Sequence, residues 1–325
     1  EYEFEKIGKL IEERKNEKLF AVSFHPETLK IGLFEITDFI KNPKERIFEV
    51  RLKSGRKVRV SKSHNLFTLN EEGKVKTIRT FELKRGEMVA VPSKIPDPID
   101  FPHRINLIDL LKDQRKDLRL RGEAVKELFE KHRTELLDAV EGKDPSLIHW
   151  WKKAESIPLD LAMKINGFSK EETLHGVRVG FKGSGHDVPA LVEIDKELSW
   201  IMGFYLAEGC RNSKQVIFAN KDEKIINRIK EYFEGLGAGV CIHKDKTECF
   251  KLIVCCKILS SVFGKFGFGH GAKNKRIPGF VYNLPKSNIN AFVDGYIAGD
   301  GRMCPEGMES CLLYTSDAAD EEDSV

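Results

Sequence analysis

Two segments of nine residues, IMGFYLAEG at 201–209 and VDGYIAGDG at 293–301, follow the same pattern. In both, glycine is third, a small residue is seventh, an acidic residue is eighth and glycine is last. Their apolar spacing is typical of helices, so the sequence predicts two similar helices from distant parts of one chain. A fold that contains both must accommodate two acids, Glu208 and Asp300, at equivalent helix ends.

Small residues form a stripe on each predicted helix. They are Gly203 and Ala207 on the first, and Gly295 and Gly299 on the second. Because residues four apart share one helix face, these stripes allow the two helix backbones to approach closely. We therefore expect the C-terminal ends of the helices to meet.

Each acid lies in the last helical turn, directly before a glycine suited to ending a helix. A carboxylate there faces the negative end of the helix dipole, which costs about 0.3 to 1 kcal/mol, and two converging carboxylates also repel each other. The arrangement disfavours stability but suits Mg²⁺, which takes hard oxygen ligands and leaves other positions to water and phosphate oxygens. Glu208 and Asp300 are thus candidate metal ligands for phosphodiester hydrolysis.

The segment between Lys265 and Lys286 is basic. It contains five lysine or arginine residues and no acid, with Phe266, Phe268, Phe280 and Tyr282 interleaved. This composition suits a surface that faces DNA, although a solvated linker accounts for it equally well.

The paired nonapeptides resemble the two motifs of the LAGLIDADG homing endonucleases in their single-chain form. Lys275-Arg276-Ile277-Pro278 also resembles the K-x-I-P block of that family. The resemblance implies double-strand DNA cleavage, with Glu208 and Asp300 binding Mg²⁺ and Lys275 orienting water or neutralising charge in the transition state. It also implies DNA contacts from Lys273, Lys275 and Arg276.

Residues 19–92 read as strands separated by Gly, Asn and Pro. Alternating runs within 47–60, joined by a turn at 53–56, predict a hairpin, and the segment GEMVAVP at 86–92 also reads as a strand. Four prolines within residues 92–102 remove amide donors and predict a domain boundary there.

Ser61 and His64 follow the second run of that hairpin in S-x-x-H spacing. The pattern resembles a conserved block of inteins, the self-splicing Hint fold, in which threonine is usual where this chain has Ser61. The resemblance implies that His64 protonates the departing backbone nitrogen at the N-terminal splice junction, while the Ser61 hydroxyl helps to hold that amide. It also implies host segments, or exteins, joined covalently to the intein.

The chain is therefore expected to be a multidomain α+β protein. We expect a partial all-β Hint domain at 1–100, a helical linker or DNA-recognition insert at 101–189, and an endonuclease repeat of order αβαββα, with the start of a second, at 190–310. The segment CLLYTSDAADE within 311–325 resembles translated sequencing adapter and is expected to be an artefactual tail. Truncation at both ends is expected to leave this polypeptide inactive in splicing and in DNA cleavage.

The composition limits the class of protein, its partners and its cellular compartment. The 325 residues carry a net charge of +3, which permits a nucleic-acid partner without requiring one. No apolar run is long enough to cross a membrane, and the seven cysteines form no C-x-x-C pair, so we expect a cytoplasmic protein with neither a zinc site nor disulfides. Two alternatives remain, a free-standing LAGLIDADG endonuclease and a DNA-binding maturase or regulator that does not cut.

Overall fold

The computed structural model describes residues 7–14, 17–40, 43–92, 101–140, 146–165, 171–269, 271–304 and 307–310. The chain forms two units, residues 3–97 in one and residues 98–325 with the first two residues in the other. The segment predicted as an artefactual tail, 311–325, lies outside the described residues. Within the described ranges, no helix combines the length and the apolar character that crossing a membrane requires.

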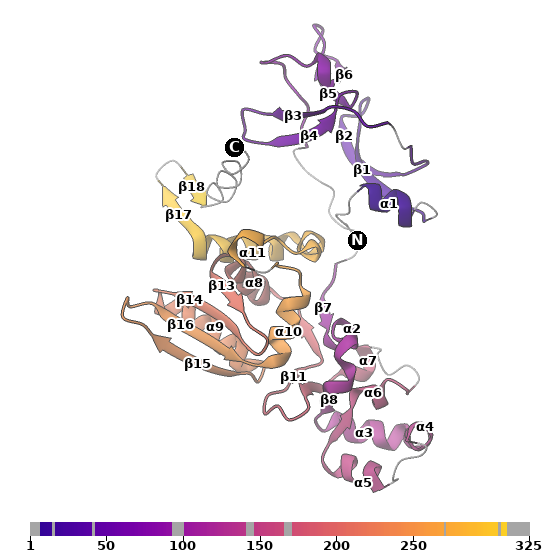
Figure 1. Cartoon of the computed structure of the whole chain (residues 1–325), viewed down its shortest axis with the longest axis vertical. Coiled ribbons are helices and arrows are strands. Elements are labelled where there is room, and N and C mark those ends of the chain that lie inside the picture. Colours follow the sequence, from indigo (N-terminus) through magenta and orange to yellow (C-terminus); the bar gives the residue numbers. More distant parts are fainter. Residues whose placement is uncertain are drawn as a thin grey trace. The chain divides into compact units, whose positions relative to one another are not determined.

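Antiparallel hairpins make up the first unit (Figure 1). Its strands pair as β1 (Phe20–His25) with β2 (Lys30–Glu35), β3 (Ile47–Arg51) with β4 (Lys57–Ser61), and β5 (Asn65–Leu69) with β6 (Val75–Arg79). Helix α1 (Ile7–Glu13) precedes them, and a 3₁₀ turn, η1 (Thr80–Glu82), follows them.

The hairpin predicted around residues 53–56 is confirmed. Arg51 pairs with Lys57, and Gly55 takes a φ of +81°, a conformation that costs glycine little. In contrast, the strand predicted at 86–92 does not form. That segment is held by single hydrogen bonds, such as the one from the Ala90 N–H to the Phe67 carbonyl oxygen at 2.9 Å.

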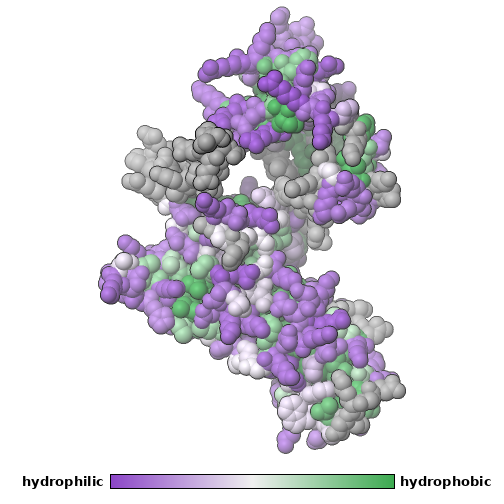
Figure 2. All heavy atoms as spheres, viewed as in Figure 1, coloured by the Kyte–Doolittle hydropathy of each residue, from purple (hydrophilic) through white to green (hydrophobic). Residues whose placement is uncertain are grey.

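The hairpins of the first unit bury little apolar surface. Among its described residues, Val50 is the buried hydrophobic side chain, while Phe20, Ile47 and Met88 are all more than half exposed. Figure 2 shows apolar atoms at the surface of this unit. Two-stranded hairpins without a covering layer leave such apolar side chains at the surface.

The second unit begins with a mixed α/β region at 104–193. Its helices are α2 (Leu107–Leu110), α3 (Ala124–Lys131), α4 (Arg133–Ala139), α5 (Ser146–Lys153), α6 (Leu159–Ala162) and α7 (Glu171–Leu174), with a 3₁₀ segment η2 (Lys112–Asp117). Its strands are β7 (Arg104–Asn106), β8 (Leu118–Arg121), β9 (Ser156–Pro158), β10 (Arg178–Phe181), β11 (Val188–Pro189) and β12 (Leu191–Glu193).

The prediction of a helical linker or insert at 101–189 is incomplete, because the region also contains strands. Strands β11, β10, β8 and β9 form an antiparallel sheet, and β12 pairs with β7. In β8, buried Leu118 and Leu120 alternate with partly exposed Arg119 and Arg121, which is the two-residue period of a strand. Four residues are too few to stand out in a sequence dominated by helical spacing.

The rest of the second unit is a four-stranded sheet with helices. In chain order it contains α8 (Lys196–Glu208), β13 (Gly209–Arg211), β14 (Val216–Asn220), α9 (Glu223–Gly235), β15 (Gly239–Lys244), β16 (Phe250–Cys255) and α10 (Lys257–Lys265). After the 3₁₀ turns η3 (Ala272–Asn274) and η4 (Gly279–Asn283) come α11 (Lys286–Asp300), β17 (Gly301–Cys304) and β18 (Gly307–Ser310). The order α-β-β-α-β-β-α has one strand more than predicted, because β13 is only three residues long.

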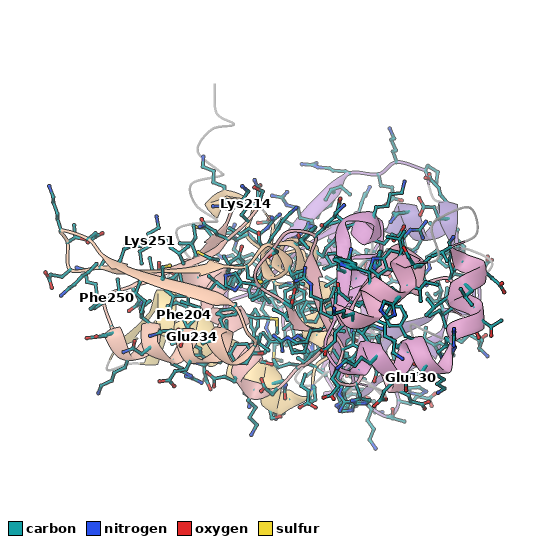
Figure 3. All side chains as sticks on the ribbon, turned by 90° about the horizontal axis from the view of Figure 1, so that it is seen from below. Glu130, Phe204, Lys214, Glu234, Phe250 and Lys251 are labelled. Atoms are coloured by element: carbon teal, nitrogen blue, oxygen red, sulfur yellow. The ribbon has the colours of Figure 1, made fainter. Side chains whose placement is uncertain are left out.

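The sheet β13-β14-β16-β15 is antiparallel, and its two faces differ. Val216, Phe218, Leu252 and Val254 point into a core shared with Phe233 of α9 and are fully buried. Figure 3 shows Lys214 and Lys251 on one side of the sheet, with Phe204 and Glu234 on the other. One face of the sheet is therefore the core face, and the opposite face is open.

Candidate functional site

Helices α8 and α11 lie side by side with their backbones in close approach (Figure 1). A Cβ atom on Gly203 would overlap the carbonyl oxygen of Phe292, and one on Gly295 would overlap the carbonyl oxygen of Trp200. The amide of Asn288 also donates to the Ile194 carbonyl oxygen at 2.7 Å, which fixes the start of α11 against the chain entering α8. The small-residue stripes are thus confirmed as the contact between the helices.

Both helices end at the predicted acids. Glu208 is the last residue of α8 and Asp300 the last of α11, and a short strand follows each. The glycines after them do not form a left-handed cap, since φ is −88° at Gly209 and −81° at Gly301. Glycine is needed there because a Cβ atom on Gly209 would overlap the Tyr205 side chain.

The side chain of Glu208 lies against α11. A Cβ atom on Gly299, the residue before Asp300, would come 3.1 Å from Cγ of Glu208. Partial burial and the negative charge of Asp300 raise the pKa of Glu208, and the positive charge of Lys275 opposes that rise. The two carboxylates are therefore electrostatically coupled at the joined helix ends.

Lys275 reaches the same place from the loop between η3 and η4. Its Nζ donates to the carbonyl oxygens of Ala207 at 2.9 Å and Tyr205 at 3.3 Å, in the last turn of α8. Burial lowers the pKa of Lys275, while the charges of Asp300 and Glu208 oppose this effect. A lysine beside two acids reduces their mutual repulsion.

These residues fit a divalent cation. Mg²⁺ is usually bound by one or two protein carboxylates, with water and phosphate oxygens completing its shell. The coupled carboxylates of Glu208 and Asp300 supply that donor set. In the part of the chain that the structure describes, no group of three or more His, Cys, Asp or Glu side chains is arranged to hold a metal, so a site here depends on oxygen atoms from solvent or substrate.

The other basic residues predicted to bind DNA lie near Lys275 in sequence but differ in environment. Lys273 and Arg276 are exposed, whereas Lys275 is half-buried. The Nε of Arg276 donates to the Gly267 carbonyl oxygen at 3.1 Å, and its backbone N–H donates to the Phe268 carbonyl oxygen at 2.9 Å. These bonds hold the loop that presents Lys275.

Ser61 and His64 lie in the first unit, at the end of β4 and in the turn that follows. The His64 N–H donates to the Ser61 carbonyl oxygen at 3.1 Å, so the S-x-x-H spacing is a tight turn. Ser61 is half-buried and His64 is exposed. The backbone N–H and the hydroxyl of buried Thr80 each donate to the His64 carbonyl oxygen at 2.9 Å.

Sequence reasoning missed three contributors to these sites. Tyr205 and Ala207 contribute backbone carbonyl oxygens. Every residue has such an oxygen, so the residue type does not reveal the contact. Thr80 could have been noticed as a hydroxyl residue at the end of a strand, but its contact with His64 requires the pairing of β5 with β6.

The model of a protein family described as the intein splicing domain matches residues 1–284. The chain belongs to the intein splicing domain family. The match includes the hairpins with Ser61 and His64, and it extends through Glu208 and Lys275. Asp300 lies beyond the residues that the family model matches.

Curated relatives include polymerases. The DNA polymerase II large subunit of Thermococcus kodakarensis is 28% identical over 298 residues, covering 86% of this chain and 15% of that protein. A DNA polymerase of the same organism is 24% identical over 388 residues, covering 94% and 22% respectively. The DNA-directed RNA polymerase subunit Rpo1C of Methanocaldococcus jannaschii is 23% identical over 260 residues, covering 79% and 23%. The chain therefore spans less than a quarter of the length of these relatives.

Proposed function

We propose that the second unit of this intein is the DNA-binding half of a metal-dependent, site-specific endonuclease of the LAGLIDADG type. The observation that carries the proposal is the meeting of Glu208 and Asp300 at the C-terminal ends of two closely packed helices, with Lys275 bound to the last turn of α8. Like charges at two negative helix ends reduce stability, so such an arrangement is expected where a cation and a phosphate are bound.

The proposed mechanism assigns a role to each of the three residues. Glu208 and Asp300 would hold Mg²⁺, and the bound ion would supply activation of water and charge stabilisation for phosphodiester hydrolysis. Lys275 uses two of its three donors on carbonyl oxygens of α8, so the third is free to orient the attacking water or to contact a phosphate oxygen. Lys273 and Arg276 then contact the DNA backbone beside the cut.

We further propose that the first unit contributes to protein splicing. In this proposal His64 gives a proton to the backbone nitrogen that leaves at the N-terminal junction, and the Ser61 hydroxyl holds the same amide. Thr80 fixes the His64 carbonyl oxygen and so sets where the imidazole can reach. The polymerase names of the relatives support a polymerase as the host protein that the intein interrupts.

The endonuclease proposal is tested on a complete intein that contains this chain and a full second endonuclease repeat after Asp300. Its substrate is plasmid DNA that carries an uninterrupted archaeal DNA polymerase II gene. We expect Mg²⁺-dependent double-strand cleavage at one site, lost in Glu208→Gln, Asp300→Asn and Lys275→Met. Glu234→Gln, at an exposed position of helix α9 in the same unit, serves as the matched control and should cut normally.

The outcomes separate the candidate functions. Specific DNA binding without cleavage by the unaltered protein would support a regulator or maturase instead. Cleavage that survives Glu208→Gln would exclude the proposed metal site. Splicing is scored separately, because His64→Ala should stop it while leaving cleavage intact.

A further inference from the structure

The open face of the sheet β13-β14-β16-β15 carries several cysteines. Cys210 is paired in register with Ile217, Ile217 with Ile253, and Ile253 with Cys241, so one row across the sheet begins and ends with a thiol. Cys241 and Cys210 are exposed. Cys210 lies two residues after Glu208 and acts on the pKa of Lys275, whereas Cys241 is not among the groups that act on Glu208 or Lys275.

A second thiol lies close to Cys241 on the same face. Cys255, the last residue of β16, pairs with Gly239 of β15, two residues before Cys241. Side chains two residues apart along a strand point to the same face, so Cys241 and Cys255 are diagonal neighbours on adjacent strands. Burial and, after it, the neighbouring Cys241 thiol raise the pKa of Cys255. The Gln215 amide also donates to the Cys255 sulfur at 3.6 Å.

The position of the pair favours closure. Because β15 begins at Gly239 and β16 ends at Cys255, the two thiols lie at the end of the ladder, where the strands can shift more easily than in its centre. The position opposite Cys255 is a glycine, so no side chain on β15 separates the two sulfurs. A Cβ atom on Gly239 would come within 2.6 Å of the His186 imidazole, which fills that space from the loop before β11.

We propose that Cys241 and Cys255 are a dithiol site that closes to a disulfide across β15 and β16 when the protein meets a small organic disulfide such as oxidised glutathione. The C-x-x-C pattern searched for in the sequence does not detect thiols on neighbouring strands. The inference is independent of the proposed endonuclease and splicing functions.

The reaction proceeds by two thiol–disulfide exchanges. The exposed Cys241 thiolate attacks oxidised glutathione, forming a mixed disulfide and releasing one glutathione thiolate. The Cys255 thiol then loses its proton and attacks the Cys241 sulfur, releasing the second glutathione. The protein loses two hydrogens, and one oxidised glutathione becomes two reduced molecules. Burial raises the pKa of Cys255, which suits it to the second step, at a mixed disulfide held beside it, rather than the first.

The test is peptide mapping of the full chain after incubation with oxidised glutathione. We expect the intact mass to fall by about 2 Da for the closed pair. Trypsin should release residues 231–244 joined to residues 252–257, and reduction should separate them. Because peptide 252–257 also contains buried Cys256, Cys256→Ser should retain the link and Cys255→Ser should lose it.

Two further measurements make the result decisive. Cys249→Ser, which removes a neighbouring thiol on the loop before β16, should leave the yield of the link unchanged. The same oxidation in concentrated urea should yield mixed pairings without preference for Cys241 and Cys255. Glutathione retained on Cys241 without closure, or an equal preference for the link in the unfolded chain, would overturn the proposal.

Discussion

The Nζ atom of Lys275 lies 2.9 Å from the carbonyl oxygen of Ala207, so a lysine from a distant loop caps the helix that ends in Glu208. Carbonyl oxygens in the last helical turn have no partner within the helix, and a cation satisfies both their hydrogen-bonding capacity and the negative end of the dipole. Lys275 thus places positive charge where the two acids add negative charge.

The pH dependence of stability should reveal the burial of Lys275. Burial lowers the folded-state pKa of Lys275 below 10.5, so the charged ammonium destabilises the folded chain at pH values below that pKa. This destabilisation disappears as the pH rises towards 10.5. Relative to Lys275→Met, the natural chain should therefore gain stability between neutral pH and pH 10.5. Urea unfolding of both proteins across this range measures the difference. A difference that stays constant with pH would show that the ammonium is not desolvated.

Glu208→Gln should stabilise the chain in the absence of metal. The folded-state pKa of Glu208 is raised above 4.5, so the ionised carboxylate destabilises the folded chain at pH values above that folded-state pKa. This destabilisation disappears as the pH falls through the folded-state pKa towards 4.5. Since the side chain retains solvent access, we expect a gain of only about 0.5 kcal/mol at pH 7. Thermal unfolding at pH 7 and pH 4 should show the gain at the higher pH alone, and Glu234→Gln should show it at neither.

Adding Mg²⁺ should reverse the order of stability. A ligand that binds only the folded chain stabilises it by about 1.4 kcal/mol at ten times its dissociation constant. We expect this increase in the natural chain and not in Glu208→Gln or Asp300→Asn. Unfolding curves over a Mg²⁺ titration, at constant ionic strength, make the measurement. An equal response in all three proteins would place the cation elsewhere.

The contact between α8 and α11 should tolerate no added methyl group. Gly203→Ala would insert a Cβ atom into the backbone of α11 at Phe292, and overpacking of this kind costs about 1 to 3 kcal/mol or more. Gly235→Ala is the matched control, since Gly235 ends helix α9 with open space around it. Chemical unfolding should therefore show a large loss for the first variant and none for the second.

The sequence predicted those parts of the molecule that depend on long or repeated patterns. The helices ending in Glu208 and Asp300 were recognised because their motif occurs twice, and their close contact followed from glycine spacing. The short strands β8 and β13 could not be predicted, because they contain too few residues to establish a hydrophobic period. The reason for glycine at position 209 was also hidden from the sequence, since only the structure shows that a Cβ atom there would overlap the Tyr205 side chain.

Long-range hydrogen bonds to the backbone were equally hidden from sequence, and the contact between Thr80 and His64 gives the last prediction. Thr80→Val should preserve side-chain shape but remove the hydroxyl that donates to the His64 carbonyl oxygen, at a cost of about 1 kcal/mol. The Thr80 N–H still serves that oxygen, so the chain should remain folded. Thr77→Val, on the exposed side of β6, is the control and should be neutral. Urea unfolding followed by signals from the first unit measures both. If the two variants unfold alike, the Thr80 hydroxyl does not hold His64 in place.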